Sequence, residues 1–149
     1  MDILYKGVDV SKHNIINWNK VNPKEIDFII IRAGFGFKTE DTNFKNNIEN
    51  AIRLGIPVGI YWFSYASTVE QAVQEAKGCL NIINHYRQYI QFPVFFDWEY
   101  ESYDYVVKTY KGTPTKQLVS DMAIAFMETV KKAGYKTGNY TNPDYCNRF

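Results

Sequence analysis

The feature that most constrains this sequence is a regular alternation of short apolar runs with segments of helical periodicity. The run at 28–34, FIIIRAG, is continuously apolar and β-branched, which is typical of a strand covered on both faces in a parallel sheet. Together the runs predict strands at 7–11, 28–34, 57–65, 93–99 and 137–141. Five strand–helix units in succession predict an α/β fold with a parallel sheet, either open and doubly wound or part of a barrel.

End signals mark the intervening helices. Asn17 is expected to cap a short helix near 18–21, and Gly55 to end the helix that contains Phe44 and Ile48. Thr68 and Gln71 match a capping box at the start of the next helix.

The second half of the chain carries similar signals. The polar, Tyr-rich segment after 93–99 is expected to be a loop. Thr113-Pro114 is expected to open a further helix that Gly134 ends, with proline in its first turn. Asn142-Pro143 predicts the start of one more helix.

The composition argues against several function classes. The net charge is +1 and the basic residues are scattered, so we expect no nucleic-acid partner. No apolar stretch approaches the roughly 20 residues of a membrane span, so we expect no membrane partner. No phosphate-binding glycine motif follows the first strand. Two histidines and the distant Cys79 and Cys146 match no metal or redox spacing, so neither a metal nor a cofactor is expected.

The strongest chemical signal is the pair Asp97 and Glu99. Sites in parallel α/β folds lie at the C-terminal ends of strands, and residues two apart on a strand share a face, with Cα atoms about 6.5–7 Å apart. Repulsion between two such carboxylates should raise one pKa, giving a proton donor near neutrality, as glycosidic cleavage requires. The alternative is that both are solvated loop residues or ion-pair partners of Arg32 and Lys side chains.

Other strand ends add weaker candidates. Asp9 is a third acid, which either caps the turn after the first strand or joins the same site, and Glu101 follows the pair. Ser11 and His13 are not expected to form a nucleophile–base pair, since residues two apart on an extended segment do not reliably hydrogen-bond. The aromatic fraction of 17% fits either a packed core or a groove that stacks on sugar rings. The other strand-end side chains are Arg32, Tyr61, Phe63, Tyr65 and Tyr140. Tyr61, Phe63 and Tyr65 are expected in the core by default, but those that reach the strand end could stack on a sugar or donate a phenolic hydrogen bond.

Several segments, taken together, resemble glycoside hydrolase family 25. GVDVS at 7–11 is similar to the opening motif of that family, and IIRAG at 30–34 and GIYWFSYA at 59–66 resemble its second and third strands. PVFFDWE at 93–99 resembles the signature that carries the catalytic Asp-x-Glu pair. The order and spacing of these segments cover essentially the whole chain.

The resemblance implies a modified TIM-type (β/α)5β3 barrel and a lysozyme-type N-acetylmuramidase. Carried over by position, Glu99 is the general acid and base, Asp97 stabilises the charged intermediate, and Asp9 completes the acidic cluster. The attacking group is either a carboxylate or the 2-acetamido group of the substrate. The implied partner is the glycan strand of peptidoglycan, with no cofactor. The expected substrate-binding residues are Tyr61, Phe63, Tyr65, Trp98, Arg32 and Tyr140.

The family pattern continues with three more strands after the fifth. We therefore expect 1–149 to be one catalytic domain that is incomplete at its C-terminus, with unpaired strand edges that favour self-association. A wall-binding protein without turnover, an inactive fragment and a different α/β enzyme such as a deacetylase are the alternatives. The N-terminus lacks the layout of a signal peptide, so we expect synthesis in the cytoplasm and release, as in phage lysis, or secretion to the bacterial cell wall.

Overall fold

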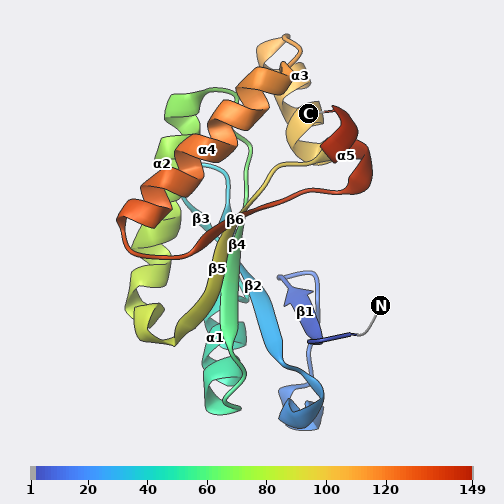
Figure 1. The fold of residues 1–149 in the computed structure, drawn as a ribbon, viewed down its shortest axis with the longest axis vertical. Coiled ribbons are helices and arrows are strands. Elements are labelled where there is room, and N and C mark those ends of the chain that lie inside the picture. Colours follow the sequence, from blue (N-terminus) through green and yellow to red (C-terminus); the bar gives the residue numbers. More distant parts are fainter. Residues whose placement is uncertain (1–2, 149) are drawn as a thin grey trace.

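The computed structural model describes residues 3–148, which form an α/β fold around one sheet (Figure 1). The five long strands are all parallel and lie in the order in which they occur along the chain. They are β1 (Gly7–Val10), β2 (Phe28–Phe35), β4 (Val58–Phe63), β5 (Ile90–Asp97) and β6 (Thr137–Tyr140). A short β3 (Thr39–Glu40) pairs antiparallel with β2. The five predicted strands are therefore confirmed, and within the described residues β1 and β6 each have one neighbour in the sheet.

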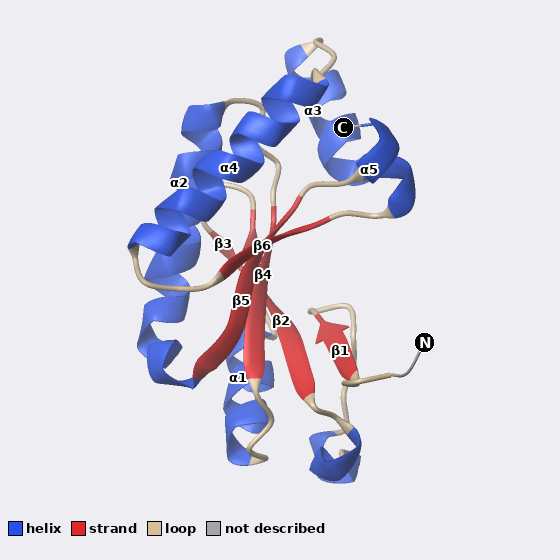
Figure 2. Cartoon of the chain, in the orientation of Figure 1, coloured by secondary structure: helices blue, strands red, loops and turns tan. Residues whose placement is uncertain are grey.

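Helices connect the strands (Figure 2). They are α1 (Phe44–Arg53), α2 (Val69–Ile83), α3 (Tyr100–Tyr110), α4 (Lys116–Lys132) and α5 (Pro143–Arg148), with 3-10 turns η1 (Trp18–Lys20), η2 (Pro23–Glu25) and η3 (Asn84–Tyr89). Helices α1, α2 and α4 pack on one face of the sheet, and α3 and α5 lie beyond the C-terminal ends of the strands. Within residues 3–148, no helix combines the length and apolar character needed to cross a membrane.

The hydrophobic core lies between the sheet and the helices α1, α2 and α4. Alternate residues of β4 and β5 point to this face, and Ile60, Trp62 and Phe96 are completely buried there. The ring of Phe96 packs 5.2 Å from that of Phe126 on α4. Burial of each large apolar side chain stabilises the fold by about 1.5–3 kcal/mol. On β2, the expectation of cover on both faces is wrong, because Phe28 and Ile30 are half-buried and border a cavity on the opposite face.

The segment after Asp97 differs from the sequence prediction. Residues expected to form a loop instead form α3, which begins after Glu99. The amide of Glu99 donates a hydrogen bond of 3.0 Å to Oγ of Ser102, as in a capping box. Val106 is buried in the core, and Tyr103 packs against that core. The cap at Glu99 and the packing of Tyr103 and Val106 against the core therefore stabilise a helix despite the polar composition of the segment.

Two other predicted helix starts need correction. Helix α4 begins at Lys116, because Oγ1 of Thr115 accepts the amide of Leu118 over 3.1 Å, so Pro114 precedes the cap. Oγ1 of Thr68 accepts the amide of Gln71 as predicted, but Oε1 of Gln71 accepts from the amide of Ser67 instead of Thr68. The predicted glycine ends are confirmed: Gly55 and Gly134 have φ of +70° and +91°, the left-handed conformation of a helix C-terminus.

Candidate active site

Side chains from neighbouring strands form rows across the open face of the sheet. The parallel register places Arg32 of β2 beside Tyr61 of β4. Two residues further along β4, Phe63 lies beside Asp97 of β5, which in turn lies beside Tyr140 of β6. Because alternate residues on a strand share a face, the two rows make one continuous wall.

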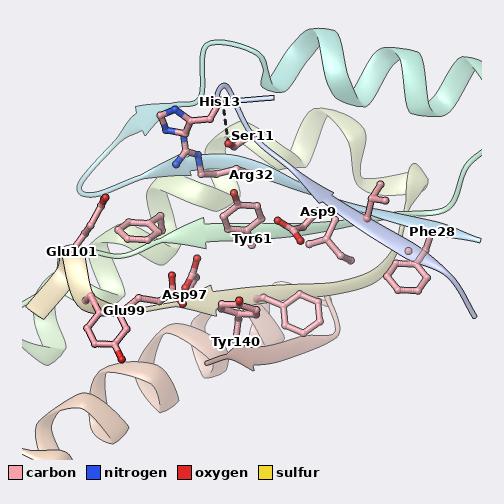
Figure 3. Close-up of a pocket in the computed structure, with 16 residues that line it drawn as sticks. Asp9, Ser11, His13, Phe28, Arg32, Tyr61, Asp97, Glu99, Glu101 and Tyr140 are labelled. Carbon is pink, nitrogen blue, oxygen red and sulfur yellow. Dashed lines mark hydrogen bonds between the residues drawn. The ribbon is translucent and has the colours of Figure 1, made fainter. Parts of the chain in front are cut away.

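This wall borders a cavity of about 670 Å³ (Figure 3). Strand β1 and the turn after it form one side of the cavity, and the first turn of α3 forms another. The lining residues are Gly7, Val8, Asp9, Ser11, His13, Phe28, Ile30, Arg32, Tyr61, Phe63, Phe95, Asp97, Glu99, Tyr100, Glu101 and Tyr140. The structure therefore brings together seven of the nine predicted site residues, namely Asp9, Arg32, Tyr61, Phe63, Asp97, Glu99 and Tyr140.

Glycine on β6 makes room for the aromatic floor of the cavity. A Cβ atom at Gly138 would lie 2.6 Å from Cε1 of Phe95, the residue paired with it on β5. Any larger residue at this position would therefore require the Phe95 ring to move.

Asp97 is the buried acid of the site. It is 5% exposed, and its Oδ1 is buried without a hydrogen-bond partner among the described residues. Burial raises the pKa of Asp97 to about 8, repulsion from Glu99 adds to the rise, and Arg32 opposes it. The predicted rise in one pKa of the pair is confirmed, but its main cause is burial and not repulsion.

Glu99 is half-buried and lies just outside the strand. β5 ends at Asp97, two residues before the predicted end of this strand, yet both carboxylates border the same cavity. Oε1 of Glu99 accepts a hydrogen bond of 3.3 Å from Nδ2 of Asn142 in the loop after β6. This bond fixes the carboxylate at the junction of β5, α3 and β6.

Asp9 is exposed on β1 and faces the cavity from the opposite side (Figure 3). The turn after β1 is held by other groups: the amide of Ser11 donates to Oδ1 of Asn14 over 2.9 Å, and the amide of His13 donates to Oγ of Ser11 over 3.2 Å. Four carboxyl groups therefore line the cavity, those of Asp9, Asp97, Glu99 and Glu101. No cluster of three or more His, Cys, Asp or Glu within residues 3–148 is arranged to hold a metal ion.

Arg32 and Tyr61 are the polar residues of the wall. Nε of Arg32 forms a buried ion pair of 2.7 Å with Oδ2 of Asp41, so the ion-pair partner of Arg32 is Asp41 and not Asp97 or Glu99. Burial raises the pKa of Tyr61 to about 12, and a side-chain hydrogen bond with Ser11 opposes the rise. Tyr61 is therefore a protonated phenol at neutral pH and can donate a hydrogen bond into the cavity.

Two predicted substrate-binding residues lie outside the cavity. Trp98 follows Asp97 directly, so its side chain points to the opposite face, where it is 3% exposed and its Nε1 donates to the carbonyl of Ala66 over 3.2 Å. Trp98 therefore does not line this cavity, and its role in binding substrate stays a prediction. Tyr65 lies just beyond the lining, with its ring centroid 5.2 Å from that of Phe63.

The cavity also contains residues that the strand-end analysis does not reach. Phe28, Ile30 and Phe95 line the cavity but lie before the C-terminal ends of their strands. Phe28 and Ile30 are an even number of residues from Arg32, and Phe95 is two residues from Asp97. Strand alternation alone could therefore have placed them on the cavity face. Tyr100 lies in the first turn of α3, a segment expected to be a loop.

Comparison with known proteins adds independent findings. The model of the family described as "Glycosyl hydrolases family 25" matches residues 8–149. The modular autolysin LytC from Streptococcus pneumoniae aligns with 30% identity and a TM-score of 0.79, over 96% of this chain and 33% of that chain. LytC in complex with a synthetic peptidoglycan ligand aligns with 32% identity and a TM-score of 0.73, over 91% of this chain and 31% of that chain.

A family 25 glycosyl hydrolase from Bacillus anthracis aligns with 25% identity and a TM-score of 0.77, over 97% of this chain and 64% of that chain. The chain therefore spans about a third of the autolysin and less than two thirds of the B. anthracis protein. No curated protein matches it in sequence.

Proposed function

The chain belongs to glycosyl hydrolase family 25, and on this premise we propose that it hydrolyses the β-1,4 bond between N-acetylmuramic acid and N-acetylglucosamine in peptidoglycan. The observation that carries the proposal is the cavity in which the buried Asp97 and the half-buried Glu99 face the same space. The complex of the S. pneumoniae autolysin with a peptidoglycan ligand supports this choice of substrate.

Burial raises the pKa of Asp97 to about 8, so the site holds a proton near neutrality. In the reactive form of this proposal, that proton is on Glu99 and Asp97 is ionised. Glu99 is the more accessible of the two, and the hydrogen bond from Asn142 orients it. It would donate its proton to the glycosidic oxygen as the bond to the anomeric carbon breaks.

Asp97 would stabilise the positive charge that develops at the anomeric carbon. Its buried position strengthens this electrostatic interaction, because little water screens it. The group that attacks this carbon is either Asp97 itself or the acetamido oxygen of the substrate. In both routes a water molecule then completes hydrolysis and returns its proton to Glu99. Asp9 would position this water or the substrate from the opposite side of the cavity.

The remaining wall residues suit a sugar ligand. Phe63 and Tyr140 offer apolar surfaces to sugar rings, and Tyr61 offers a phenolic hydrogen-bond donor. Arg32 places a guanidinium group at the cavity wall. Its ion pair with Asp41 balances the positive charge of this group.

The test is to digest purified peptidoglycan, reduce the products with borohydride and identify the new reducing ends by mass spectrometry. We expect muramic acid ends from the unmodified chain and from Glu128→Gln, a control on the exposed side of α4, but none from Glu99→Gln. New glucosamine ends would overturn the bond assignment. Binding of glycan without new ends in any sample would identify a wall-binding protein in place of an enzyme.

A further inference from the structure

A row of tyrosine rings leads from the cavity onto helix α3. Tyr65 contacts Phe63 of the cavity wall, and its ring centroid lies 5.0 Å from that of Tyr105. Tyr105 in turn lies 6.5 Å from Tyr110 at the end of α3. We call Tyr65, Tyr105 and Tyr110 the tyrosine row.

The outer rings of this row are exposed although their helix has a buried face. Tyr105 and Tyr110 are 42% and 50% exposed, whereas Val106 of the same helix is buried. Contiguous exposed aromatic surface is uncommon on a protein unless something binds to it. The exposure therefore indicates a ligand surface beside the cavity.

Hydrogen bonds hold the row in place at both ends. A side-chain hydrogen bond joins Tyr65 to Glu101, which itself lies on the cavity edge (Figure 3). At the other end, Nε2 of Gln71 donates to the hydroxyl of Tyr110 over 3.2 Å. A surface fixed in this way loses little side-chain entropy when it binds a ligand.

We infer that the tyrosine row binds further sugar units of the same glycan strand whose scissile bond lies at Asp97 and Glu99. This inference rests on the proposed function. A polymeric substrate must leave the cavity, and Phe63 and Glu101 make the row continuous with the cavity wall. Tyrosine rings match the apolar faces of sugars, and phenolic hydroxyls match their hydroxyl groups. The Glu101 carboxylate beside Tyr65 can accept hydrogen bonds from sugar hydroxyls.

The test measures binding by calorimetry in the Glu99→Gln background, so that the ligand stays intact. The probes are soluble oligosaccharides of alternating N-acetylglucosamine and N-acetylmuramic acid, from disaccharide to octasaccharide. We expect affinity to rise with length. Adding Tyr105→Ala and Tyr110→Ala should weaken octasaccharide binding about tenfold and leave disaccharide binding unchanged.

Two matched variants sharpen the result. Tyr89→Ala removes a ring of similar exposure, 41%. Tyr89 precedes the N-terminal end of β5, whereas Asp97 lies at its C-terminal end, so this variant should not change oligosaccharide binding. Tyr105→Phe with Tyr110→Phe keeps the rings and should retain most of the length dependence.

Chemical nitration provides a readout that needs no variant of the row. The octasaccharide, but not the disaccharide, should protect Tyr105 and Tyr110 from nitration in the Glu99→Gln protein. Equal losses for short and long ligands, or no protection, would overturn the inference and leave the proposed function intact. Failure of every oligosaccharide to bind would overturn both.

Discussion

Asn142 donates a hydrogen bond of 3.3 Å from Nδ2 to Oε1 of Glu99, which ties the loop after β6 to the proposed acid and base. Asn142→Ala should remove this orienting contact. A partly exposed hydrogen bond to a carboxylate contributes about 1 kcal/mol, so we expect kcat to fall about fivefold with little change in KM. Kinetics on a soluble oligosaccharide would measure both constants.

The control for this variant is Asn139→Ala. Asn139 lies on β6, just before the loop that contains Asn142, but borders a smaller cavity beside Trp98 on the opposite face. If both variants lose activity equally, a general disturbance of β6 and not the contact with Glu99 would be the cause.

The raised pKa of Asp97 predicts an upper pH limit for activity. The reactive pair needs one proton, and with a pKa of about 8 that proton is retained at neutral pH and lost as the pH rises further. We expect kcat/KM to decrease above about pH 8, approaching tenfold per pH unit. A pH profile of the unmodified chain measures this limit. Constant kcat/KM between pH 7 and 10 would contradict the shared-proton mechanism.

The causes of that shift can be separated by NMR titration of the Asp97 carboxyl. Glu99→Gln removes the repulsion, so the pKa should fall, yet it should stay above the ordinary value of 3.8 because burial, the larger cause, remains. Glu101→Gln is the control, since Glu101 does not contribute to the shift. A pKa that returns to its ordinary value in Glu99→Gln would show that repulsion dominates.

Glu75 should make the fold less stable as the pH rises. It is 3% exposed on α2, its Oε1 accepts the amide of Tyr65 over 3.0 Å, and burial raises its pKa from 4.5 to about 7. The folded chain therefore binds this proton more tightly than the unfolded chain does, so its stabilising contribution is complete below pH 4.5 and lost as the pH rises through about 7.

Glu75→Gln removes this titration. Between pH 5 and 8 the unmodified chain should lose about 2 kcal/mol more unfolding free energy than the variant. Denaturant unfolding at the two pH values measures the difference, in which the titration of Asp97 cancels. Glu128→Gln should match the unmodified chain. Parallel pH dependence of the Glu75→Gln and unmodified proteins would argue against a buried, titrating Glu75.

Trp98 and Tyr140 should separate stability from binding. Trp98→Phe loses the hydrogen bond to Ala66 and part of the core, so it should lower the unfolding free energy by roughly 1–3 kcal/mol with KM unchanged. Tyr140→Ala alters a half-exposed cavity residue and should raise KM with little effect on stability. Urea unfolding and steady-state kinetics on both variants test this contrast, and a higher KM in Trp98→Phe alone would reverse the assignment.

The sequence predicts the strands well because their apolar runs are set by burial in a sheet. It does not predict α3, because the exposed residues of this segment are mostly polar or tyrosine and its inward side has few apolar residues, notably Tyr103 and Val106. The pair Asp97 and Glu99 is predictable from its place after a strand. The dominant role of burial in the Asp97 pKa is not, because it depends on packing between segments far apart in the sequence.

Residue roles also depend on which face a strand presents. The motif places Trp98 between two carboxylates in the sequence, whereas strand alternation turns its side chain away from the cavity that Asp97 borders. The same alternation identifies Phe95 as a cavity residue. Deciding which strand residues point to the cavity face would therefore have improved the predicted site more than matching further motifs.

Asp9 and Tyr140 both line the cavity. They lie on β1 and β6, which are the two edge strands of the sheet among the described residues. Helices form from local contacts, but a parallel sheet needs contacts between distant segments and assembles slowly. In a refolding experiment, helical circular dichroism should therefore recover before turnover does. The rate at which glycan cleavage returns would therefore measure how fast the first and last strands pair with the sheet.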